Sequence, residues 1–460
     1  MTDTIWLPDL SSESGPKYQA LARALRAAVR RGDLAGGARL PPVRDLAWRL
    51  KMTPGTVARA YQIATNEGLL SGEVGRGTFV RLQPTGAYTP VASAEARIVD
   101  LRSPDLPDVG QRDVFAKILR GMADRMGQDW LFYPSQQAEA PLRDAVVDWL
   151  SDSVLGPVVA DDIVLVNGGQ NALGLVLQCC LTGENPVVAI EDLAYPGLRQ
   201  AAALVRAEAV AVEIDGEGLR PDALDALCRS RSVRAVCVTP AAQNPTTVAM
   251  STARRSEIAA IAQRHDLQII EDDCNAVTDS GRPALRALAP GRTWYVGSLS
   301  KSVAAGLRFG YVVCPSGQGE AGRQTARHSY FALARPVADV CLDLLTSGAA
   351  RRIRRDVQAD RAPRLRMVVN MLGAYDLAWQ ADVPFVWLRL PKGWRASSFQ
   401  SRAEAEGILL RSADLYVLNS GRAPNAVRLA LSGIVPLPRF EAALAALARL
   451  LANPPQELNI

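Results

Sequence analysis

Short runs of apolar, largely β-branched residues alternate with amphipathic stretches from about Ile98 to the end of this 460-residue chain. The runs lie at 163–166, 187–190, 235–238, 268–270, 295–296 and 311–313. Strands that are apolar along their whole length are typical of a parallel sheet covered by helices on both faces. We therefore expect an α/β body with a mostly parallel sheet. Ligands of such sheets bind beyond the carboxyl ends of the strands, so the residues after each run are site candidates.

A lysine follows the fifth run. It lies in the segment Ser298-Leu299-Ser300-Lys301, and Arg308 comes seven residues later. A lysine that leaves a buried strand can form an imine with the aldehyde of pyridoxal 5'-phosphate, while hydroxyls and a guanidinium bind its phosphate. This segment predicts a pyridoxal phosphate site.

Four earlier runs are followed by side chains that suit the same cofactor. Gly169 and Gln170 open a helix after the first run, and a helix N-terminus suits a phosphate. Tyr195, after the second run, can stack on a flat ring, and Asn244, after the third, can bind a phenolic oxygen. Asp272, after the fourth, can keep a pyridine nitrogen protonated. Each feature alone is weak evidence, but five in this order indicate the cofactor.

The first part of the chain is basic. Residues 1–81 hold 12 Lys or Arg and 7 Asp or Glu, whereas the remaining residues hold 40 of each. A basic module on a neutral body indicates a polyanionic partner for the module. The alternative is a solvated basic face without a partner.

The pattern within this module favours DNA as the partner. Apolar residues at helical spacing follow Pro16, a short helix is expected over 43–50, and a third from Pro54 to about Asn66. Two short strands around Gly75-Arg76-Gly77 complete a winged helix-turn-helix. The second helix of such a motif enters the major groove, and a wing can reach the minor groove. The expected DNA-binding residues are Arg44, Thr53, Gly55, Thr56, Arg59 and Arg76.

Residues 12–81 resemble the winged helix-turn-helix of the GntR family of bacterial regulators. The resemblance rests on segments 40–47, 56–61, 68–70 and 75–80. One departure is Glu73-Val74, where the family often has a basic residue. Residues 82–97, which lack periodicity, are expected to form a linker.

Residues 98–460 resemble a fold-type I, class I aminotransferase. The resemblance implies a large subdomain over about 150–345 and a small one that comprises about 355–460 together with segment 98–149. It implies that Lys301 is the Schiff-base lysine, that Tyr133 reaches the phosphate of a neighbouring subunit, and that Arg428 holds a substrate carboxylate. Within it, the cofactor-binding residues are Lys301, Asp272, Asn244, Tyr195, Gly169, Gln170, Ser298, Ser300, Arg308 and Tyr133.

The two parts together resemble the MocR subgroup of GntR regulators. This resemblance implies a head-to-tail homodimer, a double-stranded DNA operator with two half-sites, and an amine or amino-acid effector. The effector, or the cofactor itself, would be sensed through aldimine chemistry at Lys301. The usual tyrosine after the pyridine aspartate is replaced by Cys274 and Asn275, and an expected glycine is Ala138, so we expect regulation rather than efficient turnover. A working aminotransferase, or a scaffold that has lost its cofactor, are the alternatives.

Other features of the sequence bear on where the protein works and on whether it binds membranes or metals. The apolar runs are too short or too interrupted to span a bilayer, and the start lacks the regions of a signal peptide, so we expect a cytoplasmic protein without membrane contact. Seven cysteines lie mostly in apolar segments, as reduced thiols do. His265 and His328 are the only histidines and no Cys-x-x-Cys occurs, so no metal site is expected.

Overall fold

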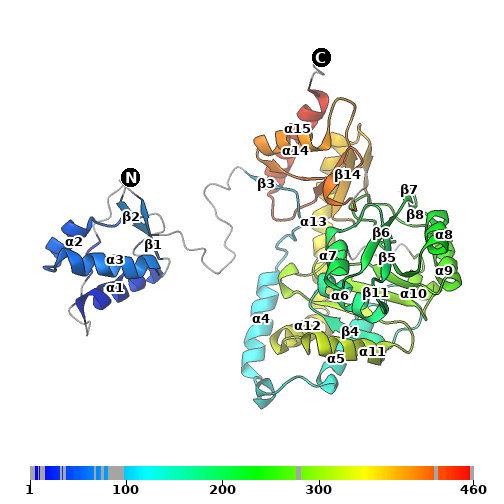
Figure 1. Ribbon diagram of the computed structural model, residues 1–460, viewed down its shortest axis with the longest axis horizontal. Coiled ribbons are helices and arrows are strands. Elements are labelled where there is room, and N and C mark those ends of the chain that lie inside the picture. Colours follow the sequence, from blue (N-terminus) through cyan, green and yellow to red (C-terminus); the bar gives the residue numbers. More distant parts are fainter. Residues whose placement is uncertain are drawn as a thin grey trace. The chain divides into compact units, whose positions relative to one another are not determined.

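The computed structural model divides the chain into two compact units, Met1–Ala96 and Arg97–Ile460 (Figure 1). It describes residues 6–8, 10, 16–31, 34, 38–66, 69–73, 77–80, 98–275, 281–418 and 423–455, and only the backbone at 27, 30, 31, 66 and 71–73. The expected linker, 82–97, lies outside the described residues. None of the described helices combines the length and the apolar character needed to cross a membrane.

The N-terminal unit is a winged helix-turn-helix, as the sequence predicts. Its elements are α1 (Lys17–Arg31), α2 (Val43–Arg49), α3 (Pro54–Asn66) and an antiparallel pair, β1 (Leu70–Glu73) and β2 (Gly77–Val80). Leu21 of α1, Leu46 of α2 and Val57 of α3 are buried in one small core. The Tyr61 hydroxyl donates to the Pro41 carbonyl at 2.9 Å, which ties α3 to the start of α2.

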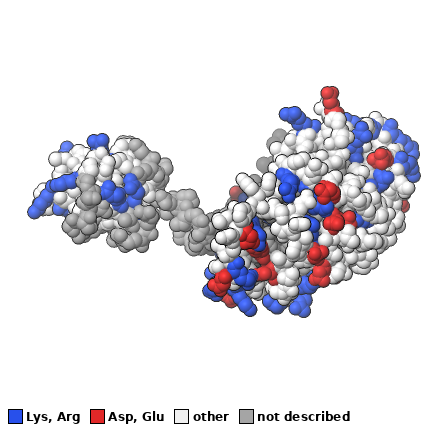
Figure 2. Space-filling view, turned by 90° about the horizontal axis from the view of Figure 1, so that it is seen from below, with Lys and Arg blue, Asp and Glu red and all other residues white. Residues whose placement is uncertain are grey.

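Lys and Arg side chains are visible on the N-terminal unit in Figure 2, whereas both signs of charge mix on the larger unit. This distribution agrees with the basic excess of residues 1–81.

The larger unit is built on a seven-stranded sheet. The strand order is β4 (Ile163–Val166), β12 (Gly310–Val313), β11 (Thr293–Ser298), β10 (Gln268–Asp272), β9 (Val233–Val238), β5 (Val187–Glu191) and β6 (Glu208–Val212). Only β12 runs antiparallel to its neighbours, so the expected mostly parallel sheet is confirmed. The strands are apolar throughout because helices cover both faces.

Alternate residues of β4 show the two covered faces. Val164 and Val166 pack with α6 and α7, and Ile163 and Leu165 pack with α5 (Gln136–Trp149) and α12. Further along the sheet, α8 and α9 cover the second face. The helices of this part are α6 (Gly169–Cys180), α7 (Pro196–Leu204), α8 (Pro221–Ser230), α9 (Thr252–Arg264), α10 (Leu285–Leu288), α11 (Gly319–Tyr330) and α12 (Arg335–Thr346).

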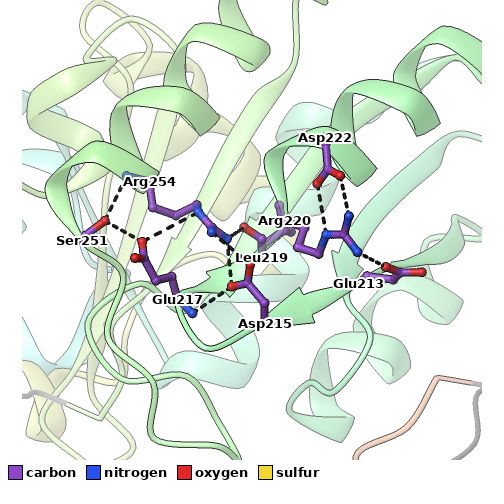
Figure 3. A network of polar contacts seen from close by, with 8 residues as sticks. All are labelled: Glu213, Asp215, Glu217, Leu219, Arg220, Asp222, Ser251 and Arg254. Atoms are coloured by element: carbon purple, nitrogen blue, oxygen red, sulfur yellow. Dashed lines mark hydrogen bonds and ion pairs between the residues drawn. The ribbon is translucent and has the colours of Figure 1, made fainter.

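A short hairpin, β7 (Ile214–Asp215) and β8 (Gly218–Leu219), carries a network of ion pairs (Figure 3). Arg254 of α9 binds both carboxylate oxygens of Asp215, each at 3.0 Å, and donates to the Leu219 carbonyl at 2.9 Å. Arg220 pairs with Glu213 and Asp222.

The small subdomain has a four-stranded sheet in the order β13 (Leu377–Ala378), β14 (Phe385–Arg389), β17 (Ala426–Ala430) and β16 (Arg411–Ser412). Two helices, α14 (Ala396–Ala405) and α15 (Leu437–Ala452), pack on it. The long helix α13 (Ala349–Leu372) belongs to both subdomains: Ile353 and Val357 enter the core of the large subdomain, and Val368 and Leu372 that of the small one.

Segment 98–149, which we expected to belong to the small subdomain, packs mostly on the large one. Only β3 (Val99–Asp100) joins the small subdomain, by pairing with β15 (Ile408–Leu409). The helices α4 (Gln111–Asp124) and α5 (Gln136–Trp149) pack on the large subdomain in Figure 1. The reason is the apolar face of α5, where Leu142, Val146 and Trp149 are buried in the core around β4.

Candidate functional site

A cavity of about 480 Å³ opens beyond the carboxyl ends of the parallel strands. Its wall contains every cofactor residue expected from the sequence except Tyr133: Gly169, Gln170, Tyr195, Asn244, Asp272, Ser298, Ser300, Lys301 and Arg308, together with Arg428. These residues meet because the ends of neighbouring parallel strands lie at one edge of the sheet.

Lys301 lies in the turn that follows β11. Burial lowers the pKa of its amine, and the nearby guanidinium groups of Arg428, Arg308 and Arg361 lower it further against an opposing effect of Asp105. A larger share of the amine is therefore neutral and nucleophilic near pH 7. Arg361 of α13 donates to the Lys301 carbonyl at 3.2 Å, which fixes the backbone of this turn.

The two serines before Lys301 form a compact hydroxyl pair. Ser298 Oγ donates to Ser300 Oγ at 2.9 Å and accepts from the Ser300 backbone N–H at 3.0 Å. The guanidinium of Arg308 lies beside Gly168, where an added Cβ would come 2.8 Å from Arg308 Nη2. Because Gly168 also has a φ of +79°, the close approach requires glycine.

Asp272 ends β10 with a buried carboxylate. Its Oδ1 accepts the Cys274 backbone N–H at 2.9 Å. Burial raises the pKa of Asp272, and hydrogen bonds from the backbone and thiol of Cys274 oppose that rise. Cys274 itself packs against α6, since a Cβ at Gly169 would lie 2.4 Å from its sulfur. The residue in the place of the family tyrosine thus supports the aspartate.

Tyr195 and Gln170 meet over Gly197. Tyr195 precedes α7, and Gln170 Nε2 donates to the Gly197 carbonyl at 2.8 Å. A Cβ at Gly197 would come 2.2 Å from the Tyr195 ring, so the ring lies directly over this backbone. The Gln170 Oε1 atom is buried without a hydrogen-bond partner among the described residues.

Arg428 reaches the cavity from β17 of the small subdomain. It donates to Asn244 Oδ1 at 3.0 Å and to the Arg102 carbonyl at 2.8 Å. Its guanidinium lies over the rings of Phe385 and Tyr416, at 4.9 and 5.3 Å from their centroids. Burial lowers the pKa of this guanidinium. Its Nε is buried without a partner among the described residues.

Tyr133 lies away from the cavity on an exposed apolar segment. Its side chain is 84% exposed and its ring centroid is 5.0 Å from that of Phe331. The adjacent Leu131 and Phe132 are also exposed. Ala138, where the family has glycine, donates its backbone N–H to the Ser135 side chain at the start of α5.

Of the expected DNA-binding residues, Thr53, Gly55, Thr56 and Arg59 lie at the beginning or in the first half of α3, and Arg44 lies on α2. Thr53 accepts the Thr56 N–H at 3.3 Å and thus caps the helix. Gly55 and Arg44 are exposed. Arg59 is exposed too, and its guanidinium lies 4.3 Å from the centroid of Tyr18 on α1. Arg76, in the wing, lies outside the described residues.

Sequence reasoning did not single out several residues of the cavity wall: Arg102, Arg411, Tyr416 and Phe385. They come from short strands and connections of the small subdomain and its adjoining segment. One available signal was the short apolar run on both sides of Arg428, Ala426-Val427 and Leu429-Ala430, which is consistent with a buried strand and therefore with neighbours across it.

The fold and the cavity define an aminotransferase-like protein that carries a DNA-binding module. The profile for aminotransferase class I and II matches residues 96–434, and that for bacterial regulatory proteins of the gntR family matches 17–80. The chain belongs to the class I and II aminotransferase family, and with its GntR unit it is a transcriptional regulator of the MocR type.

The chain is similar to several individual proteins, over its full length or over part of it. The chain is 27% identical over 450 residues to the uncharacterized HTH-type transcriptional regulator YdeF of Bacillus subtilis (strain 168), in a match that covers 97% of this chain and 96% of that protein. It is 27% identical over 328 residues to the probable rhizopine catabolism regulatory protein MocR of Rhizobium meliloti, 65% of this chain and 66% of that one. The α-aminoadipate aminotransferase LysN of Thermus thermophilus, solved with N-(5'-phosphopyridoxyl)-L-leucine, shares the fold with a TM-score of 0.67 and 23% identity over 77% of this chain and 92% of that one.

Proposed function

We propose that this protein is a pyridoxal phosphate-dependent transcriptional regulator whose aminotransferase-like unit senses an amino compound, or the cofactor itself, at Lys301. The observation that carries the proposal is the cavity, in which Lys301, Asp272, Asn244 and Arg308 converge within a chain that also holds a GntR-family module.

The residues of the cavity fit the cofactor. Pyridoxal phosphate supplies an aldehyde that binds amines covalently and a ring that withdraws electrons. Arg308 and the Ser298 and Ser300 hydroxyls would hold the phosphate, beside a glycine that leaves no room for a side chain. The buried carboxylate of Asp272 would keep the ring nitrogen protonated. Among the remaining groups, the unpartnered Gln170 Oε1 is a buried acceptor at the same wall.

Asn244 is oriented for the ring oxygen. Its Oδ1 accepts from Arg428, so its amide nitrogen is left to donate. Tyr195 would stack on the ring, and Arg428 would bind a carboxylate of the effector. Since Cys274 and Asn275 offer no phenol for proton control, Lys301 is better suited to exchange its place with an effector amine than to repeated proton transfer.

The partners follow from the exposed surfaces. The apolar segment around Tyr133 would be covered in a head-to-tail homodimer, in which Tyr133 reaches the phosphate of the neighbouring subunit. The dimer would bind an operator with two half-sites through the start of α3. The contacts would be made by Arg44, Thr53, Gly55, Thr56, Arg59 and Arg76.

Absorption spectroscopy and operator binding test the proposal together. The purified protein should show the band of a lysine-bound cofactor, and Lys301→Ala should abolish it, whereas Lys392→Ala, which changes a lysine outside the cavity, should not. Operator affinity should change on adding cofactor and an amine. Affinity that stays the same under all conditions would refute regulation through the cavity.

The second candidate function is a working aminotransferase that carries a DNA module. It is favoured by the intact set of Lys301, Asp272 and Arg428 around one cavity. Steady conversion of amino acids to keto acids, measured with a pool of amino donors, would support it over sensing.

A further inference from the structure

A second arginine stands beside Arg428 in the cavity wall. Arg411 of β16 is the direct cross-strand partner of Arg428 of β17, and both residues line the cavity. Directly opposed residues on neighbouring strands have Cβ atoms about 5 Å apart on the same face, and like charges in that position are destabilising. Both guanidinium groups donate to the same acceptor, the Arg102 carbonyl, at 3.0 Å from Arg411 Nε and 2.8 Å from Arg428 Nη2.

The other charges of the cavity are already matched once the cofactor of the proposed function is bound. The charged residues of the wall are Arg102, Arg308, Arg411, Arg428, Lys301 and Asp272. Arg102 forms an ion pair with Asp100 at 2.7 Å. In the proposed function the phosphate engages Arg308, and one carboxylate engages Arg428.

Arg411 has no direct partner in this pairing, although its charge, with that of Arg102, helps to lower the pKa of Asp100 against the effect of burial. Within the part of the chain that the structure describes it forms no ion pair, and its only hydrogen bond uses Nε. The two terminal nitrogens are therefore available to an anion in a partly exposed position at the cavity. A carboxylate matches the planar donor pair of a guanidinium.

We infer that Arg411 binds a second carboxylate, so that the effector is an amino acid with two acidic groups rather than a monocarboxylic amine. This inference rests on the proposed function and narrows it. Aromatic rings flank Arg428, whose guanidinium lies over Phe385 and Tyr416. Burial raises the pKa of the Tyr416 hydroxyl, and the charges of Arg428 and Arg411 partly oppose that rise.

Calorimetry of the full-length protein with pyridoxal phosphate present tests the inference, with the cofactor spectrum recorded in the same samples. The probes are L-aspartate and L-asparagine, and L-glutamate and L-glutamine, which differ only in the second acid. We expect the dicarboxylate of at least one pair to bind tenfold or more tightly than its amide. Arg411→Gln should remove that preference while leaving affinity for the amide within twofold, and Arg411→Lys should restore part of it. Arg402→Gln, an exposed arginine of α14, should change neither affinity.

Two results would overturn the inference: equal affinity for acid and amide in both pairs, or an Arg411→Gln loss of the same factor for both, which would mean that the two arginines share one carboxylate. Equal affinities together with a spectral change for all four probes would overturn the inference while leaving the proposed function intact. Conversely, an acid preference that depends on Arg411 without any spectral change would support the inference and contradict sensing at Lys301.

Discussion

Replacing Leu46 by alanine should destabilise the DNA-binding module without affecting the stability of the rest of the protein. Leu46 of α2 has an exposed fraction of 0% and lies in a core that only residues of the N-terminal unit build. Truncating such a leucine costs about 2–5 kcal/mol. The folded module spans about 64 residues, from Lys17 to Val80, for which a total stability of about 3–10 kcal/mol is usual. A loss of about 3 kcal/mol therefore removes a large part of its stability.

Differential scanning calorimetry of the full chain measures this effect. A module of this size should unfold with an enthalpy of about 45 kcal/mol, several times less than the larger unit, so the two transitions can be assigned. The mutation should lower the Tm of the small transition by roughly 12 °C or more, since about 4 °C is lost per kcal/mol in a small domain. Operator binding should fail at the same temperature.

The matched control is Trp48→Ala on the same helix, because the Trp48 side chain is 81% exposed and its loss should cost less than about 0.5 kcal/mol. If Leu46→Ala shifts both transitions together, the two units do not fold independently. If Trp48→Ala lowers the small transition as far as Leu46→Ala does, burial is not the cause of the loss.

Three further outcomes are expected. Burial raises the pKa of Asp273 to about 7, so between about pH 4 and about pH 7 its carboxyl stays protonated in the folded state while it ionises in the unfolded state. The free energy of unfolding should therefore fall by up to about 4 kcal/mol as pH rises from about 4 to about 7. In urea unfolding, Asp273→Asn should lack this contribution to the pH dependence. Gly169→Ala brings a Cβ within 2.4 Å of the neighbouring cysteine sulfur and should weaken cofactor binding about tenfold in a spectral titration, whereas Gly174→Ala, with open space on the same helix, should not. Arg254→Met removes the bidentate ion pair with Asp215 of Figure 3 and should cost about 1 kcal/mol in urea unfolding at neutral pH. Because the pairing lowers the pKa of Asp215, the cost should shrink as pH falls below the ordinary pKa of that carboxyl. An equal cost at pH 3 and pH 7 would contradict the role of the pair.

The sequence was sufficient for the part of the cavity that the parallel sheet builds. Gly169, Tyr195 and Asn244 each follow a strand and Asp272 ends one, and parallel strands present such residues at one edge whatever the lengths of the helices between them. The order of the strands within the sheet could not be predicted from the sequence in the same way. One strand, β6, was missed because its residues at 208–212 are only partly buried at the edge of the sheet, and the pattern there is weakly apolar.

The small subdomain was less predictable because its contacts join segments that are distant in the chain. Arg102 and Arg411 are separated by 309 residues but share a hydrogen bond. The strand of Arg411 is two residues long, too short to show periodicity. The apolar face of α5 was visible in the sequence, but nothing local shows which subdomain it covers, since both offer apolar surfaces.

The contacts of Arg428 and Arg411 decide which of the two can be mutated to test effector recognition without disturbing cofactor binding. Arg428 holds the Asn244 side chain, which we propose as a ligand of the ring oxygen, so a change at Arg428 disturbs the cofactor site and the carboxylate site at once. Arg411 has no bond to a proposed cofactor ligand in the described part of the chain, and its one hydrogen bond goes to a backbone carbonyl. A loss of effector affinity in an Arg411 variant with an unchanged cofactor spectrum therefore has a single physical cause, the missing guanidinium, whereas the same loss in an Arg428 variant has two.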